Sequence, residues 1–202
     1  MDHDRFMRAI ESIDRAHCED PNQELWEGCV YPKELLYSQR MTAWLQQLQP
    51  DAPEALRLAA RAQHLRRWMV AREDYPATRE GYLKWRSRLY GFHAEQAESL
   101  LRLAGYDGDT IAVVKKIVAK RGLKRDPEVQ LIEDVACLVF LEHYFPAFAG
   151  GQDEDKLIGI VRKTWLKMSE VARAQALELK LPETLQVIVV KALTPEGPFP
   201  PQ

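Results

Sequence analysis

Two acidic residues, Glu133 and Asp134, interrupt the stretch LIEDVACLVFLEHYF, residues 131–145, which otherwise reads as a buried helix. A carboxylate removed from water is costly unless a charged partner or a metal ion compensates it. Two histidines lie on similarly apolar segments, His64 in AARAQHLRRW and His93 in LYGFHAEQAESLL. Imidazole and carboxylate groups are ligands of zinc, iron and manganese. The set His64, His93 and Asp134 therefore predicts a site for one divalent metal ion (Zn, Mn or Fe).

A structural interpretation competes with this metal site. A single histidine on an apolar helix face is more often a hydrogen-bonded core residue than a ligand. Asp134 could equally pair with an arginine from a neighbouring helix. Glu133 could face solvent, because adjacent helical residues point about 100° apart. Both interpretations predict that Asp134 is buried within reach of a histidine or an arginine.

Basic residues are concentrated between residues 61 and 88, where eight Lys or Arg meet three acids in a chain of formal net charge −2. Guanidinium groups suit phosphate and carboxylate oxygens. Tyr75, Tyr82 and Trp85 of the same segment could stack against a base. We expect this segment to line a pocket for an anionic or phosphorylated ligand. The expected binding residues are Arg67, Arg72, Arg79 and Arg86, with Lys163 from a later segment.

The spacing of apolar residues is helical over nearly the whole chain, so the elements that position these residues are expected to be helices. The pattern predicts an all-α protein of about seven to eight helices. A single domain is expected over residues 1–194, followed by a proline-rich disordered tail at 195–202. An irregular connection is expected between Cys18 and Pro32. The expected helices cover about residues 6–17, 32–48, 53–72, 78–104, 109–121, 127–146, 153–180 and 182–193.

Composition and motifs exclude several classes of protein. The small net charge gives no overall field that would attract nucleic acid or a membrane. The three cysteines have no CxxC spacing, which argues against a structural zinc site. The apolar segments are shorter than a membrane span, and the N-terminus has no apolar region typical of a secretory signal. GxGxxG, GxxxxGK[ST] and GxSxG motifs do not occur. We therefore expect a cytoplasmic protein with no membrane partner.

The order and separation of His64, His93 and Asp134 resemble the metal-dependent HD-domain phosphohydrolases. These are all-helical enzymes with a histidine, then a His-Asp pair, then a distant aspartate. This sequence departs from that pattern, because His93 is followed by Ala94 where the family has an aspartate. The resemblance implies an HD-domain-like fold and hydrolysis of a small phosphorylated or nucleotide-like compound.

Other residues could replace the missing aspartate. Glu133 could accept a proton from a water molecule whose pKa the metal lowers. Asp14 and His17, in IDRAHCEDP, have the i, i+3 spacing that places both on one helix face. We expect Glu133 as the catalytic residue, and Asp14 and His17 as additional candidates.

A second resemblance covers nearly the whole chain. The segments RMTAWL, RAQHLRRW, YPATREGYLKWR, QLIEDVACLVFLEHYF and KTWLKMS are similar to an uncharacterised helical family of bacteria and fungi that has no assigned activity. This resemblance implies a helical fold and leaves the function open. The alternative to a hydrolase is a non-enzymatic binding module that uses the basic aromatic segment 61–88 to engage RNA or an acidic partner.

Overall fold

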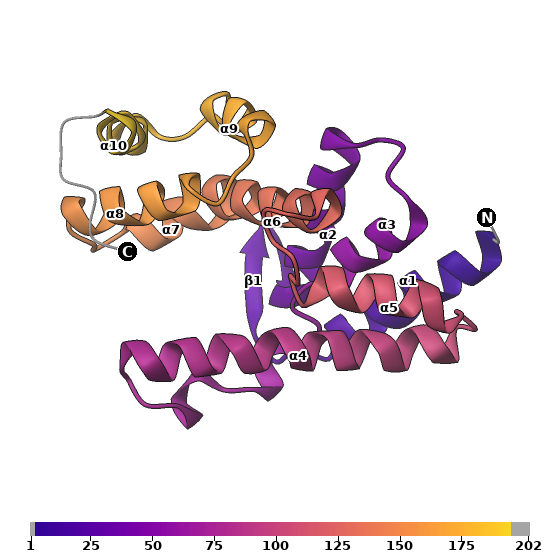
Figure 1. Ribbon diagram of the computed structural model, residues 1–202. Helices are drawn as coiled ribbons and strands as arrows, with labels where there is room; N and C mark the ends of the chain where they lie inside the picture. The colour runs from indigo at the N-terminus through magenta and orange to yellow at the C-terminus, as the bar shows by residue number, and fades with distance from the viewer. Residues whose placement is uncertain (1–2, 195–202) are drawn as a thin grey trace. The chain divides into compact units, whose positions relative to one another are not determined.

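The computed structural model describes residues 3–194, and helices dominate it (Figure 1). The chain divides into two compact units, Met1–Ile132 and Glu133–Gln202. The single domain expected over residues 1–194 stays a prediction, and the predicted tail lies outside the described residues. Among the described residues, no helix combines the length and the apolar character that crossing a membrane requires.

The first unit contains five helices, a β-hairpin and two short 3-10 turns. A core of fully buried side chains, including Ile13, Leu56, Leu101 and Ile117, joins four of the helices. The longest helix, α4, runs beside α5 (Figure 1). The elements are α1 (His3–Cys18), β1 (Gln23–Trp26), β2 (Cys29–Pro32), α2 (Lys33–Leu48), α3 (Glu54–Arg61), η1 (Arg67–Met69), η2 (Arg72–Asp74), α4 (Arg79–Leu103) and α5 (Gly108–Val118).

The starts of α4 and α5 follow from local sequence signals. The side chain of Thr78 accepts a hydrogen bond from the Gly81 amide at 3.1 Å, and that of Asp107 accepts one from the Thr110 amide at 2.8 Å. Gly81 also lies against the loop before α4, where an added Cβ would come within 2.2 Å of the Pro76 carbonyl oxygen. Only glycine fits at this position without a shift of the backbone.

The connection expected to be irregular between Cys18 and Pro32 is instead an antiparallel hairpin of β1 and β2. Its two-residue loop, Glu27 and Gly28, has φ angles of 49° and 80°. Positive φ at both loop residues is the geometry that suits a tight hairpin, and Gly28 adopts it at no steric cost. The strands are four residues each. They are too short to show a clear alternating pattern in the sequence.

The helix expected over residues 53–72 ends at Arg61, so that prediction is wrong beyond this residue. The chain turns because His64 and Arg66 have φ angles of 61° and 54°, in the left-handed region. The backbone amide of Arg67 donates to the His64 carbonyl at 2.9 Å and closes the turn. His64 therefore lies on a turn and not on the helix face that the sequence predicted.

The helix α6 (Pro127–Val139) begins in the first unit and continues into the second. It leads into a π-helical turn, η3 (Phe140–Tyr144), and into α7 (Phe145–Ala149). The Phe145 amide donates to the Phe140 carbonyl, five residues earlier. Pro146, which has no amide hydrogen, follows directly. The sixth helix was expected to end near residue 146, but helical turns continue to Ala149.

The rest of the second unit consists of α8 (Glu154–Trp165), α9 (Glu170–Leu177) and α10 (Glu183–Leu193). The single helix expected over 153–180 is two helices, because Ser169 caps a new one: its side chain accepts from the Ala172 amide at 3.3 Å. α8 and α10 pack against each other (Figure 1). The described residues form ten α-helices, so the fold is mostly helical as predicted but has more helices than the expected seven to eight.

Candidate functional site

Three histidines and one glutamate form a cluster in the interior of the first unit. His17 comes from α1, His64 from the turn after α3, His93 from α4 and Glu34 from the first turn of α2. The rings of His64 and His93 lie 5.8 Å apart between centroids. His17, His93 and Glu34 are buried, whereas the side chain of His64 keeps 29 % of its surface exposed. We call these four residues the histidine cluster.

Two of these imidazoles have one nitrogen held by a backbone carbonyl and the other nitrogen without a partner. His17 Nε2 lies 3.1 Å from the Arg61 carbonyl oxygen, and His93 Nδ1 lies 2.9 Å from that of Leu65. A carbonyl oxygen only accepts, so each of these nitrogens must carry the hydrogen. The other nitrogens, His17 Nδ1 and His93 Nε2, are buried and have no hydrogen-bond partner among the described residues.

Burial keeps these rings neutral. Removal from water lowers the pKa of His17, and burial together with the neighbouring His64 lowers that of His93 to about 3. A neutral imidazole with a hydrogen on one nitrogen has a lone pair on the other. Two lone pairs are therefore directed into a buried region where the described part of the chain provides no donor for them.

Glu34 and Tyr37 fix the third ring. His64 Nδ1 lies 3.1 Å from Glu34 Oε2, and the Tyr37 ring stacks on the imidazole at 4.1 Å between centroids. Arg67 Nε lies 3.7 Å from the other oxygen of Glu34. Burial raises the pKa of the Glu34 carboxyl to about 7. Burial, followed by the positive charges of Arg67 and Lys120, holds the pKa of His64 well below its ordinary value.

Asp20 anchors the helix that carries Glu34. Its buried carboxylate accepts hydrogen bonds from the Glu34 amide at 3.0 Å and from the Asn22 amide at 2.9 Å. The first turn of α2 is thereby held, although Pro32 provides no side-chain cap. The position of the Glu34 carboxylate beneath His64 follows from this support.

The two acids singled out in the sequence belong to the second unit. Asp134 keeps only 3 % of its surface exposed, as its apolar neighbours predict, and its Oδ1 accepts a hydrogen bond from the Ser169 amide at 2.8 Å. Glu133 is buried too, and not solvent-facing, with its Oε1 3.7 Å from Lys167 Nζ. The partners that the structure describes for the two acids, Ser169 and Lys167, thus both lie in the segment between α8 and α9. A metal centre built from His64, His93 and Asp134 stays a prediction.

Residues 3–194 contain no group of three or more His, Cys, Asp or Glu side chains arranged to hold a metal ion. Asp14, considered as an additional ligand, is engaged elsewhere. Its two carboxylate oxygens accept from Arg61 at 2.6 and 2.7 Å. Asp14 and His17 are the additional candidates for the site. His17 belongs to the histidine cluster, whereas Asp14 makes this ion pair with Arg61.

The basic residues of the segment 61–88 are spread over several local contacts. Arg67 lies over the Trp85 ring at 4.8 Å, next to Glu34. Arg72 donates to the carbonyl oxygens of Tyr75 and Pro76 at 2.8 and 3.0 Å. Arg86, another predicted anion-binding residue, donates to the Tyr90 hydroxyl. The last two, Arg79 and Lys163, are exposed, and Lys163 belongs to the second unit.

Sequence reasoning did not find Glu34, Tyr37 or Asp20. Glu34 and Tyr37 are three residues apart on α2, a spacing that places them on one face. No sequence signal shows that this face turns toward His64, because the contact depends on how α2 and α3 pack. The segment DPN, residues 20–22, did indicate a turn, because an aspartate side chain commonly accepts a hydrogen bond from the backbone amide two residues later in the chain.

The geometry defines a mostly helical protein with a cluster of neutral histidines in its first unit. The chain belongs to a family described as a domain of unknown function (DUF4202), whose model matches residues 7–189. This confirms the resemblance to an uncharacterised family and provides no support for the HD-domain resemblance. No significant match exists among curated proteins or among solved structures.

Proposed function

We propose that this chain is a metal-dependent hydrolase acting on a small phosphorylated or nucleotide-like compound, with the metal held by the histidine cluster. The observation that carries the proposal is a pair of buried imidazole nitrogens, His17 Nδ1 and His93 Nε2, that have no partner within the part of the chain that the structure describes. Buried polar atoms are normally satisfied, so each unsatisfied one calls for an explanation. A metal ion that accepts both lone pairs supplies it.

The hydrogen bonds of the cluster fit this role. Histidines that bind metals usually donate their other ring hydrogen to a carbonyl or a carboxylate, which fixes the ring orientation. His17 and His93 do so to carbonyls, and His64 does so to Glu34. Two imidazoles on one tetrahedral zinc ion would have centroids roughly 5 Å apart, close to the 5.8 Å between His64 and His93.

The proposed ligands are therefore His17, His64 and His93, with Glu34 as the residue that orients His64. These side chains are not arranged as a metal site in residues 3–194, so binding would require the three rings to turn toward one ion. Asp134 is left out of this set because its carboxylate already accepts the Ser169 amide. A bound divalent ion would lower the pKa of water toward neutrality and polarise a phosphoryl oxygen. An HD-domain-like arrangement of His64 and His93 is part of this proposal and has no support from the comparisons.

Positive charge near His64 supports an anionic substrate. The charges of Arg67, Lys120 and Arg86 all act on this imidazole. Arg67 keeps 31 % of its side chain exposed and His64 keeps 29 %, so the same edge of the cluster is open to solvent. A guanidinium beside an exposed ligand is well placed to hold a phosphate oxygen.

The proposal is tested by the metal content of protein purified without chelators or a metal-binding tag. We expect about one divalent ion per chain in the wild type. Folded His64→Ala and His93→Ala variants should lose it. His143→Ala is the matched control: it removes a histidine of the second unit that pairs with Glu142 at 3.0 Å, so metal content should not change.

Activity is then measured on nucleotides and phosphate monoesters with the metal-loaded wild type. Hydrolysis should disappear in the two cluster variants and persist in His143→Ala. A folded wild-type protein that takes up no divalent ion, even from an excess, would overturn the hydrolase proposal.

The second candidate function is a binding module in which the segment 61–88 engages RNA or an acidic partner. The exposed side chains of Arg79 and Tyr82 favour it. Arginines, however, already lie over the aromatic rings: Arg67 and Arg72 over Trp85, and Arg86 over Tyr82. Because these guanidiniums cover ring faces that a base would use, we rank this function below the hydrolase.

A further inference from the structure

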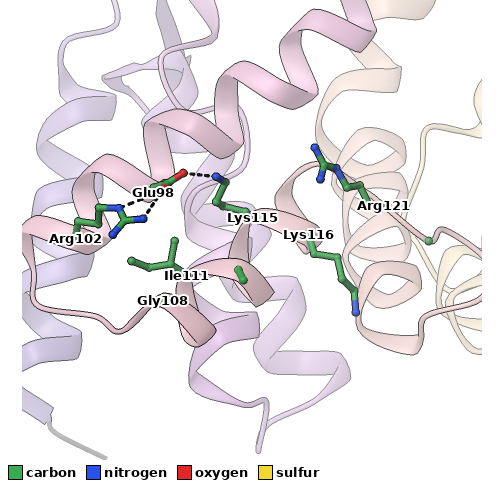
Figure 2. A pocket seen from close by; sticks show the side chains of 9 residues that line it. Glu98, Arg102, Gly108, Ile111, Lys115, Lys116 and Arg121 are labelled. Atoms are coloured by element: carbon green, nitrogen blue, oxygen red, sulfur yellow. Dashed lines mark hydrogen bonds and ion pairs between the residues drawn. The ribbon is translucent and has the colours of Figure 1, made fainter.

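A groove lies along α5, where the C-terminal half of α4 and the turn after α5 border it (Figure 2). Its volume is about 670 Å³, within the roughly 300–1,000 Å³ typical of small-molecule pockets. Gly108, Ile111 and Ala112 contribute small or apolar surface to its lining. No histidine lines this groove, so it is separate from the proposed metal site.

The charged side chains around the groove are mostly basic, with four cations and one acid. The acid, Glu98, is neutralised on both sides: Arg102 donates to it at 2.7 Å, and Lys115 pairs with its other oxygen (Figure 2). Glu98 therefore holds these two cations in place along the α4 side. The other two cations, Lys116 and Arg121, extend the positive surface toward the end of α5 (Figure 2).

The turn after α5 brings Arg121 back beside Lys116. The Arg121 amide donates to the Lys116 carbonyl oxygen at 3.0 Å, and Gly122 follows with a φ of 93°. Lys116 pairs with Asp126. The exposed guanidinium of Arg121 has no acidic partner among the residues described. The positive charge at this end of the groove is thus not fully compensated.

We infer that this groove binds a small anion that carries more than one phosphate group. Cations on opposite borders of a concave site attract an extended polyanion more strongly than a single phosphate. The lining contains no aromatic ring, so the stacking that single-stranded nucleic acid needs is not provided. The small side chains at Gly108 and Ala112 in the lining allow a ligand to approach α5 closely.

Calorimetry with inorganic triphosphate as the probe tests the inference, on metal-free protein in a chelator. We expect measurable binding that weakens as salt rises, and weaker binding of orthophosphate. Arg121→Glu should weaken triphosphate binding by about tenfold or more, and Lys116→Ala by a smaller factor. Arg8→Glu is the matched control: it reverses an exposed charge on α1 and should leave the affinity unchanged.

The outcomes separate this groove from the histidine cluster. His64→Ala should bind triphosphate like the wild type, even where the hydrolase proposal fails. Equal weakening by Arg121→Glu and Arg8→Glu would show a general charge effect and overturn the inference. Binding of an RNA oligonucleotide in preference to triphosphate would overturn it as well.

Discussion

The histidine cluster of the first unit and the acid pair of the second unit both contain buried ionisable groups, but they differ in their partners. Asp134 and Glu133 face a backbone amide and a lysine that lie close together in the chain. His17 and His93 each have a ring nitrogen with no hydrogen-bond partner in residues 3–194. Burial of a polar group alone does not indicate a site, because a satisfied group is explained by the fold it stabilises. An unsatisfied group calls for an explanation, and the proposed metal ion is the one offered for these two nitrogens.

The largest effect is expected from Asp134→Ala, which removes the acceptor of the Ser169 amide. We expect the free energy of unfolding to fall by about 3 kcal/mol, because a charge-assisted bond is lost in a buried setting. Urea unfolding measures the change. Asp155→Ala, at an exposed position of α8, should change it by less than about 0.5 kcal/mol. Equal effects of the two variants would remove the structural role of Asp134.

The pH dependence of stability should show that the cluster histidines are buried as neutral rings. The pKa of His93 is lowered to about 3, below its ordinary value of 6.5. Below pH 6.5 the unfolded chain therefore binds a proton at this histidine that the folded chain does not, so the contribution of His93 to stability falls as the pH falls. The raised pKa of Glu34 acts in the opposite direction over the same range. Between pH 7 and 5 the contribution of His93 is about 2 kcal/mol.

The measurement is urea unfolding in a chelator at both pH values, for the wild type and for His93→Gln. The variant should lose less stability between pH 7 and 5 than the wild type. The lowered pKa of His17 acts in the same direction and the raised pKa of Glu34 in the opposite one, so only the difference between the two proteins is assigned to His93. Identical losses in the two proteins would show that His93 titrates normally.

A moderate effect on metal affinity is expected from Glu34→Gln. The carboxylate makes the His64 ring a more basic ligand, and removing such a partner typically weakens metal binding by 10–100-fold. We expect about a tenfold loss for zinc, because glutamine can still accept from His64 Nδ1. Zinc titration by calorimetry gives the value, with Glu11→Gln on the exposed face of α1 as the control. An unchanged affinity would separate Glu34 from the metal site.

The smallest effect is expected from Ser169→Ala, at about 1 kcal/mol of unfolding free energy. This change removes the side-chain cap of α9 but keeps the backbone amide that donates to Asp134. Because the Ser169 amide contacts Asp134 directly, the losses in the double variant with Asp134→Ala should depart from additivity. Full additivity in urea unfolding would show that the two hydrogen bonds act independently.

The parts of the fold that the sequence predicted well are those with local signals. α4 begins after Thr78 and ends before Gly105, and α6 begins at Pro127. The turn that carries His64 had no such signal, since residues 62–66 contain neither glycine nor proline. Tertiary contacts hold it: His93 donates to the Leu65 carbonyl, and His64 contacts Glu34. Contacts of this kind depend on how the helices pack and cannot be read from spacing.

The same limit applies to the candidate site. His64 and His93 could be selected because a histidine on an apolar segment is conspicuous, and His17 because it follows Asp14 by one helical turn. Glu34 looked like an ordinary acid in the first turn of a helix, where negative charge is favourable anyway. Asp134 was correctly expected to be buried. The partner that the structure describes for Asp134 is the backbone amide of Ser169. Because nearly every residue has a backbone amide, the sequence does not indicate which one will pair with a given acid.

The β1–β2 hairpin has a consequence for the behaviour of the protein in concentrated solution. Leu25 and Val30 face each other across the strands and are 71 % and 65 % exposed. Each strand pairs only with the other within the described part of the chain, so its outer edge offers unpaired amides and carbonyls. Exposed apolar edges of this kind promote strand addition between molecules. Leu25→Lys should therefore delay aggregation, measured by light scattering, without disturbing the helices.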